Sequence, residues 1–185
     1  AAPEGSGAMS AVLGMDAAVI ENVLNGREGV SIANYNCPGQ IVITGEAAAV
    51  AEAGTALKEA GARRVLPLKV SGPFHSPMMR PAGEELAKVF ARVSMNPLKI
   101  PYVANINAEV ITDCGRIEGL LVEQVSGSVR WQQSVETMIR EWVDTFVEIG
   151  PGKTLTGFLR KIDKNVKAYH IGSWEEAVQV CEELK

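Results

Sequence analysis

The sequence predicts a fold of the α/β class that combines two segments of different architecture. In residues 1–70, strand-like and helix-like stretches follow one another in the order β-α-β-β-α-β. This order is typical of a ferredoxin-like subdomain, in which two helices cover one face of an antiparallel sheet. In residues 71–185, strands alternate with helices, which indicates an α/β layer with a mostly parallel sheet. We expect each of these two ranges to form one subdomain.

Six elements are expected in the first segment, and each follows from a local pattern. Apolar or β-branched runs that end at turn-forming residues predict strands. These runs are residues 8–13, 30–34, 40–44 and 63–70. Asp16 is placed to cap a helix that reaches residue 24, and an alanine-rich helix over residues 46–60 ends at Gly61.

The second segment is predicted to contain more helix than strand. Helices are expected at residues 78–93, 117–125, 134–143, 154–162 and 174–184. The helix at 134–143 should place Val135, Met138, Ile139 and Trp142 on one face, and Ser173 should cap the last helix. Strands are expected at residues 100–105, 145–149 and 166–171. Three strands are fewer than the usual sheet of about 5–6, so such a sheet would have bare edges or an uncovered face. We therefore expect that partner strands are missing from this chain.

Composition and charge argue against several classes of function. Apolar residues make up 46% of the 185 residues, which is enough for a core, and charged residues make up 22%. The net charge of −4 gives no indication of a nucleic-acid surface. No apolar run approaches the ~20 residues of a membrane span, and the N-terminal stretch lacks the pattern of a signal peptide.

The few cysteines and histidines do not form a metal-binding pattern. Cys37, Cys114 and Cys181 are odd in number and far apart, which indicates free thiols in a reducing cytoplasm. With only two histidines in the chain, His75 and His170, a zinc site is not expected. We expect a cytoplasmic protein that uses neither a metal nor a cofactor.

His75 lies in the stretch that separates the two segments. Gly72, Pro73 and Pro77 exclude a regular helix or strand there, so His75 is presented on an irregular turn after a strand. Imidazole titrates near neutrality, which makes His75 a candidate general base. The alternative is a histidine that only fills a loop.

Other residues of the chain offer weaker candidates for chemistry. Gly-Pro-Gly-Lys-Thr at residues 150–154 is similar to a phosphate loop, but Val147 stands where that motif requires a glycine. A helix entry that packs tightly, or that offers N–H groups to an oxyanion, is the better interpretation.

A nucleophilic serine is not evident in the sequence. No Gly-x-Ser-x-Gly elbow occurs, and Ser71 and Ser76 are poorly placed to pair with the adjacent His75. His170 ends an apolar run, where a structural role is expected.

Two pairs of asparagines are candidates for lining a site. Asn34 and Asn36 lie in a stretch rich in turn-forming residues, so turn formation is their simplest interpretation. Asn105 and Asn107 follow a predicted strand, and loop residues in such places often line a site.

Four motifs occur in an order and spacing similar to those of one known family. They are Gly-Ala-Met-Ser-Ala-Val-Leu-Gly at residues 7–14, Asn-Tyr-Asn-Cys-Pro-Gly-Gln-Ile-Val-Ile-Thr-Gly at 34–45, Val-Ser-Gly-Pro-Phe-His-Ser at 70–76 and Glu-Ile-Gly-Pro-Gly-Lys-Thr-Leu-Thr-Gly at 148–157. The chain resembles the malonyl-CoA:acyl-carrier-protein transacylases of bacterial type II fatty-acid synthesis. The resemblance covers essentially all of the sequence.

The resemblance implies a fold and a reaction. The family has an α/β-hydrolase-like large subdomain with a ferredoxin-like insert. Residues 1–70 match the insert, and residues 71–185 match the C-terminal part of the large subdomain. The reaction transfers malonyl from malonyl-CoA to a serine and then to the phosphopantetheine thiol of acyl carrier protein.

Roles for individual residues follow from the same resemblance. His75 corresponds to the general base, and the backbone carbonyl of Gln124 corresponds to the group that orients it. Asn34 and Asn36 correspond to residues that line the cleft between the subdomains. Phe74 corresponds to the bulky residue of members that select malonyl over methylmalonyl.

The sequence also departs from the family in one large respect. The Gly-His-Ser-x-Gly elbow and the arginine that pairs with the malonyl carboxylate precede the insert in the family, and neither occurs here. The chain therefore resembles a C-terminal fragment, and we expect it to be inactive alone. Two alternatives stay open: an acyltransferase domain of a polyketide or large fatty-acid synthase, and a non-catalytic module that binds carrier protein or assembles with another chain.

The expected partners are malonyl-CoA and acyl carrier protein, with neither nucleic acid nor membrane, and the resemblance implies a monomeric enzyme. Candidate charges for docking an acidic carrier protein are Arg63, Arg64, Arg80, Arg160, Lys161 and Lys164. Ordinary solvated charges are the alternative interpretation for each.

Overall fold

A four-stranded antiparallel sheet with two helices forms the first part of the chain. The computed structural model describes residues 5–70 and 72–184. The first part contains β1 (Gly7–Leu13), α1 (Ala17–Leu24), β2 (Val30–Cys37), β3 (Gln40–Glu46), α2 (Ala47–Glu59) and β4 (Arg64–Pro67). The strand order is β2-β3-β1-β4, and every neighbouring pair is antiparallel. The predicted ferredoxin-like architecture is confirmed, although the boundary at residue 70 stays a prediction.

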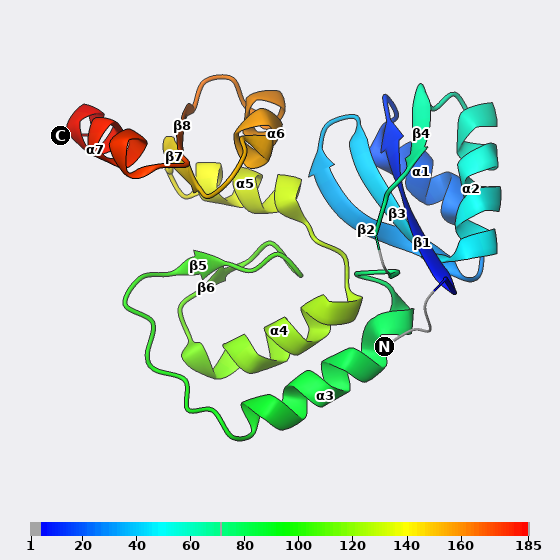
Figure 1. Cartoon of the computed structure of the whole chain (residues 1–185), viewed down its shortest axis with the longest axis horizontal. Coiled ribbons are helices and arrows are strands. Elements are labelled where there is room, and N and C mark those ends of the chain that lie inside the picture. The colour runs from blue at the N-terminus through cyan, green and yellow to red at the C-terminus, as the bar shows by residue number, and fades with distance from the viewer. Residues whose placement is uncertain (1–4, 71, 185) are drawn as a thin grey trace.

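Both faces of this sheet are buried. On one face, Val12, Ile41 and Ile43 form a core with Ile20 of α1 and Leu57 of α2, all almost completely buried. Since side chains alternate along a strand, the neighbouring residues point to the opposite face. There Met9, Ala11, Ala33 and Val42 form a second buried cluster. The sheet therefore lies between its two helices and the rest of the chain (Figure 1).

The second part of the chain consists mainly of helices. It contains η1 (Pro77–Met79), α3 (Arg80–Phe90), β5 (Tyr102–Val103), β6 (Val110–Ile111), η2 (Cys114–Arg116), α4 (Ile117–Ser126), α5 (Trp131–Arg140), β7 (Thr145–Ile149), α6 (Thr154–Ile162), β8 (Lys167–Ile171) and α7 (Trp174–Glu183). Helices α3 and α4 lie side by side below the β5–β6 hairpin in Figure 1. None of the helices in the described ranges is both long and apolar enough to cross a membrane.

Several expectations for the second part are corrected. The described part of the second segment does not form one mostly parallel sheet: β7 and β8 pair in parallel, whereas β5 and β6 form a separate antiparallel hairpin of two residues each. Pro97 and Pro101 flank Ile100, which is exposed, and the strand expected at residues 100–105 is reduced to Tyr102–Val103.

Helix boundaries also differ from those predicted. The helix expected at residues 134–143 runs from Trp131 to Arg140. Trp142 has a φ of 67° and is 92% exposed, so it ends the helix and does not belong to its buried face. The predicted cap of α7 is confirmed, since Ser173 Oγ accepts a hydrogen bond from Glu176 N at 3.3 Å.

The two parts are joined by hydrogen bonds as well as by the chain. The segment between α4 and α5 runs along the edge strand β2, where Val129 forms a parallel bridge with Asn34. Val129 N donates to Ala33 O at 2.7 Å, and Tyr35 N donates to Val129 O at 2.8 Å. The end of α4 is thereby fixed against the small sheet.

Replacing Leu57 by alanine is expected to destabilise the fold through the helix-covered core. Leu57 is fully buried, so Leu57→Ala should lower the free energy of unfolding by about 2–5 kcal/mol, measured by urea denaturation. Leu121→Ala, at an exposed position of α4, is the control and should lower it by less than about 1 kcal/mol. An equal loss of unfolding free energy in Leu57→Ala and Leu121→Ala would contradict the helix-covered core described above.

Candidate functional site

His75 lies on a strained turn that is anchored to the small sheet. Its φ is 59°, which is uncommon for a residue other than glycine and costs on the order of 1–3 kcal/mol. Pro73 is fully buried, and a Cβ placed on Gly7 of β1 would lie only 2.4 Å from its ring. Ser76 Oγ donates to Pro73 O at 2.7 Å. Buried residues on both sides therefore hold the half-buried imidazole in place.

The imidazole of His75 meets the C-terminal end of α4. His75 Nδ1 lies 3.0 Å from the carbonyl oxygen of Gln124. The last four carbonyls of a helix have no intrahelical partner, and α4 ends at Ser126, so this oxygen is available. A carbonyl oxygen only accepts, which places the proton on Nδ1 in the neutral ring. The lone pair of Nε2 is then free to take a proton.

The carboxamide of Gln124 holds the chain that follows the same helix. Its Nε2 donates to the carbonyl oxygens of Gly127 at 2.9 Å and Ser128 at 3.3 Å. Ser128 Oγ in turn donates to Ile32 O of β2 at 2.6 Å. The carbonyl that faces His75 is therefore fixed both by α4 and by the small sheet.

The other predicted site residues are not hydrogen-bonded to the ring of His75. Within the described residues, its hydrogen bond goes to Gln124 and not to Asn34, Asn36 or Phe74. Phe74 is adjacent in the chain and partly exposed. The turn assignment for the two asparagines is wrong: β2 extends to Cys37, and irregular pairing along β2 accommodates both residues within the strand.

Among the remaining candidates, the asparagines after β5 have structural contacts. Asn107 Oδ1 accepts from Glu109 N at 3.1 Å, and Asn105 O accepts from Arg130 N at 2.8 Å. Ser76 is committed to Pro73 O, as described above, while the candidate Ser71 lies outside the described residues. Of the two serines that flank His75 in the sequence, the described one therefore has its hydroxyl engaged with the backbone.

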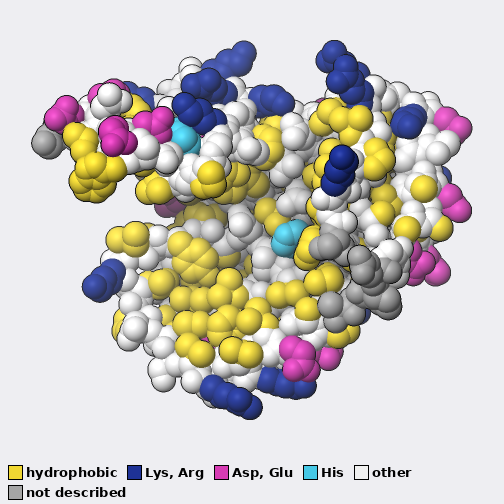
Figure 2. Space-filling model, viewed as in Figure 1, with side chains coloured by type: hydrophobic (Ala, Val, Ile, Leu, Met, Phe, Trp, Pro, Cys, Tyr) yellow, Lys and Arg dark blue, Asp and Glu magenta, His cyan; other side chains and the backbone are white. Residues whose placement is uncertain are grey.

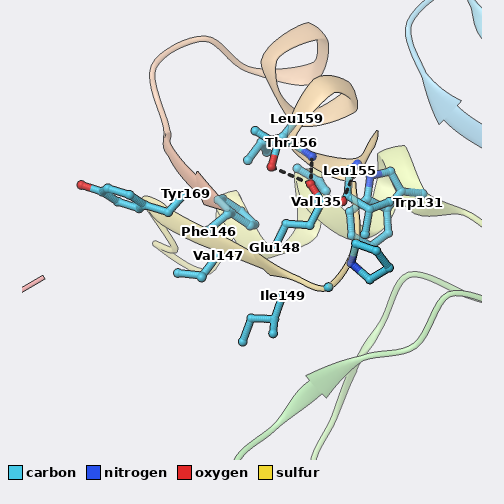
Figure 3. Close-up of a pocket in the computed structure, with 12 residues that line it drawn as sticks. Trp131, Val135, Phe146, Val147, Glu148, Ile149, Leu155, Thr156, Leu159 and Tyr169 are labelled. Carbon is cyan, nitrogen blue, oxygen red and sulfur yellow. Dashed lines mark hydrogen bonds between the residues drawn. The ribbon is translucent and has the colours of Figure 1, made fainter. Parts of the chain in front are cut away.

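The glycine-rich entry to α6 is occupied by a side chain of the protein itself. The carboxylate of Glu148 accepts from Leu155 N at 3.0 Å, Thr156 N at 2.7 Å and Thr156 Oγ1 at 2.6 Å (Figure 3). Burial of the Glu148 carboxylate opposes ionisation, but these hydrogen bonds outweigh it and lower its pKa. Because Glu148 occupies the N–H groups that a phosphate would use, the structure does not support a phosphate loop.

A largely apolar cavity of about 370 Å³ lies beside Glu148 and does not include His75. Its apolar lining residues are Trp131, Val135, Phe146, Val147, Ile149, Pro151, Leu155, Leu159 and Tyr169. Apart from Pro151, which lies in the turn after β7, they come from α5, from α6 and from the β7–β8 pair, as Figure 3 shows. Ile149 is 78% exposed, and Trp131 Nε1 is buried without a hydrogen-bond partner in the described ranges. This face of the protein is thus apolar and uncovered.

His170 has a structural position. Its Nε2 lies 2.9 Å from Gly150 O, and its Nδ1 lies 3.5 Å from a carboxylate oxygen of Glu176. These contacts connect β8 to the turn after β7 and to α7. Across residues 5–70 and 72–184, no group of three or more His, Cys, Asp or Glu side chains could hold a metal ion.

Comparison with known proteins shows the family to which the chain belongs. The profile of the acyl transferase domain matches residues 1–180. The malonyl CoA-acyl carrier protein transacylase of Bacillus subtilis is 42% identical over 189 residues, which cover 100% of this chain and 60% of that protein. The chain therefore belongs to the acyl transferase domain family.

Solved structures lead to the same family. The acyl-carrier-protein S-malonyltransferase of Bartonella henselae matches with a TM-score of 0.94 and 39% identity, over 99% of this chain and 59% of that one. A malonyl-transacylase in complex with a type II PKS acyl-carrier protein matches with a TM-score of 0.91 and 36% identity, over 98% and 60%. The chain thus spans about 60% of the length of these relatives.

Loss of the Glu148 carboxylate is expected to destabilise the protein in a pH-dependent way. Glu148→Gln should lower the free energy of unfolding at pH 7 by about 1 kcal/mol, because the N-terminal N–H groups of α6 lose a charged acceptor. The pKa of Glu148 is lowered by folding, so its contribution is present above the unfolded value of about 4.3 and is lost as the pH falls through the folded pKa.

The measurement is urea denaturation of both proteins between pH 7 and pH 3. The difference between them should shrink as the pH falls below the unfolded value of about 4.3 and through the lowered pKa of folded Glu148. Glu52→Gln, on the exposed face of α2, is the control and should show no such difference. If Glu148→Gln lowered the free energy of unfolding by the same amount at every pH, the negative charge of Glu148 would not be the source of its stabilising effect.

Proposed function

We propose that this chain supplies the general base of a malonyl-CoA:acyl-carrier-protein transacylase. The observation that supports it is the contact of His75 Nδ1 with Gln124 O, which leaves Nε2 unprotonated and able to act as a base. Membership of the acyl transferase domain family and the names of the relatives support the same reaction class.

In the first half of the reaction, Nε2 of His75 takes the proton of a serine hydroxyl. The serine oxygen attacks the thioester carbonyl carbon of malonyl-CoA, the carbon–sulfur bond breaks, and the imidazolium returns the proton to the coenzyme A thiolate. Positive charge on the ring is stabilised by the Gln124 carbonyl, which accepts from Nδ1 throughout. The serine belongs to the family's elbow motif, which this sequence does not contain.

In the second half, the same nitrogen serves the incoming thiol. Nε2 takes the proton of the phosphopantetheine thiol, and the sulfur attacks the malonyl-serine ester. The carbon–oxygen bond then breaks, and the proton passes back to the serine oxygen. One base therefore serves both half-reactions, and no cofactor enters the scheme.

Three further residues take roles in substrate binding. Asn34 and Asn36, in β2 next to the α4–α5 connection, line the cleft between the subdomains. Phe74 precedes His75, and its ring would crowd an α-methyl group, which favours malonyl over methylmalonyl. We also propose a cytoplasmic location, where the three cysteines remain free thiols.

Removal of the base should slow acyl transfer in the complete parent enzyme. His75→Ala should lower the rate of acyl-serine formation by a factor on the order of 10²–10⁴, measured by rapid-quench trapping of labelled malonyl-enzyme. His170→Gln removes the other histidine, which has structural contacts, and should leave that rate within about twofold. An unchanged rate in His75→Ala would reject the assigned role.

The 185-residue chain alone should not catalyse malonyl transfer. Incubated with radiolabelled malonyl-CoA and acyl carrier protein, it should give no malonyl transfer above background, because the described residues place no free serine hydroxyl at His75. Measurable turnover by the purified chain would contradict the proposed division of the active site.

A further inference from the structure

The carbonyl oxygen of Gln124 is free because the chain leaves α4 soon after this residue. In a continuing helix the oxygen would accept from the N–H of the residue four positions later, which is Ser128. Gly127 instead has an extended backbone, with a φ of −103° and a ψ of 158°. The backbone hydrogen bonds of the described residues accordingly include none from Ser128 N to Gln124 O. The path of the chain after α4 therefore decides whether this oxygen can face His75.

The carboxamide of Gln124 is bonded to this departing stretch of chain. Its Nε2 donates to Gly127 O at 2.9 Å and to Ser128 O at 3.3 Å. Its Oε1 is buried and has no hydrogen-bond partner among the described residues, which is costly for a polar atom. The two donated bonds therefore set the orientation of the side chain. Gln124 thus provides the acceptor for His75 through its backbone and a restraint on that acceptor through its side chain.

The same stretch is also anchored to the small sheet. We call residues 127–129 the strap. Ser128 Oγ donates to Ile32 O at 2.6 Å, and Val129 N donates to Ala33 O at 2.7 Å. Both acceptors belong to buried residues of β2. The strap is therefore bonded to the end of α4 on one side and to the edge of the sheet on the other.

Apolar packing restrains the strap as well. A Cβ placed on Gly127 would overlap with Ile106 Cδ1, so the backbone of the strap lies directly against this side chain. Ile106 follows β5 and packs against the buried cluster of Ala104, Ile111 and Leu120. Figure 2 shows mainly hydrophobic side chains over α4 and the β5–β6 hairpin. Since hydrogen bonds are stronger in apolar surroundings, the bonds made by the Gln124 carboxamide have a large effect on the path of the strap.

The body of α4 is held in place by contacts that do not involve the strap. Gly83 of α3 is buried, and a Cβ placed on it would lie 3.1 Å from Val122 O, so the two helices approach closely. Leu120 is buried in the cluster with Ala104 and Ile111. A change in the Gln124 side chain should therefore alter the last carbonyls of α4 without unfolding the helix.

We propose that the carboxamide of Gln124 is a positioning group for the base. It holds the strap away from the helical path, so that Ser128 N does not take Gln124 O and this oxygen stays available to Nδ1 of His75. The catalytic meaning of this role rests on the proposed function, in which His75 is the base. Any residue at position 124 would supply a carbonyl, but only a side chain of this length with N–H donors also holds the strap.

Nitrogen-15 NMR of the histidine-labelled 185-residue chain tests the positioning role at a pH where His75 is neutral. Gln124→Met keeps the backbone carbonyl and the approximate size of the side chain, but it removes both donated bonds. The ratio of the Nδ1–H to the Nε2–H tautomer of His75 should fall by about fivefold, the effect expected for the loss of one neutral hydrogen bond. A merely structural role of the side chain would not change this ratio.

The matched control is Gln132→Met. The described hydrogen bond of Gln132 Nε2 goes to Glu136 Oε1, at 2.8 Å, within α5. This variant removes an equivalent carboxamide from a partly buried position of another helix, and it should leave the tautomer ratio of His75 within about 1.5-fold of wild type.

A second pair of variants covers the case in which Gln124→Met does not fold. Ser128→Ala removes the bond from Ser128 Oγ to Ile32 O and should lower the tautomer ratio about twofold, because the strap keeps its bonds to Gln124. Ser128→Thr keeps a hydroxyl at the same place and should restore the wild-type ratio.

Kinetics in the complete parent enzyme provide an independent readout. Gln124→Met should lower the rate of acyl-serine formation at saturating malonyl-CoA about fivefold, because a smaller fraction of His75 has an unprotonated Nε2. The KM for malonyl-CoA should stay within about twofold, since the change does not remove a contact with the substrate.

An unchanged tautomer ratio in both Gln124→Met and Ser128→Ala, or an equal change in Gln132→Met, would overturn the positioning role. These outcomes leave the proposed function intact, since His75→Ala tests that separately. Conversely, a lowered ratio in Gln124→Met together with an unaffected rate in His75→Ala would support the positioning of the ring and reject the proposed function.

Discussion

The hydrogen bond between His75 Nδ1 and the carbonyl oxygen of Gln124 is the contact on which the functional account depends. It fixes the tautomer of a half-buried imidazole and leaves Nε2 as the basic nitrogen. Neither partner would hold this geometry alone. The histidine needs a turn with a positive φ, and the carbonyl needs a helix that ends where α4 ends, so that its oxygen is not used within the helix.

The small sheet supports this contact from two directions. Pro73 anchors the histidine turn against β1, while Ser128 and Val129 anchor the end of α4 against β2. The carboxamide of Gln124 connects the second anchor to the residue whose carbonyl faces the imidazole. The ferredoxin-like part therefore positions the proposed base.

Local patterns in the sequence were sufficient to predict the small sheet, but not the second part of the chain. The apolar run at residues 8–13 and the β-branched run at 40–44, each next to turn-forming residues, agree with β1 and β3. The apolar pattern did not predict the extent of the strand expected at residues 100–105 or of the helix expected up to residue 143. Ile100 and Trp142 are apolar and yet exposed, so neither belongs to a buried face. The occupation of the α6 entry by Glu148 depends on a contact across 7 to 8 residues between strand and helix, which no local pattern reveals.

The central claim is that the Gln124 carbonyl holds His75 as the Nδ1–H tautomer. Nitrogen-15 NMR of the histidine-labelled chain tests it most directly, since protonated and unprotonated ring nitrogens of a neutral imidazole have well-separated shifts. The account predicts a protonated Nδ1 and an unprotonated Nε2 for His75 at a pH where the ring is neutral. A predominant Nε2–H tautomer would contradict it.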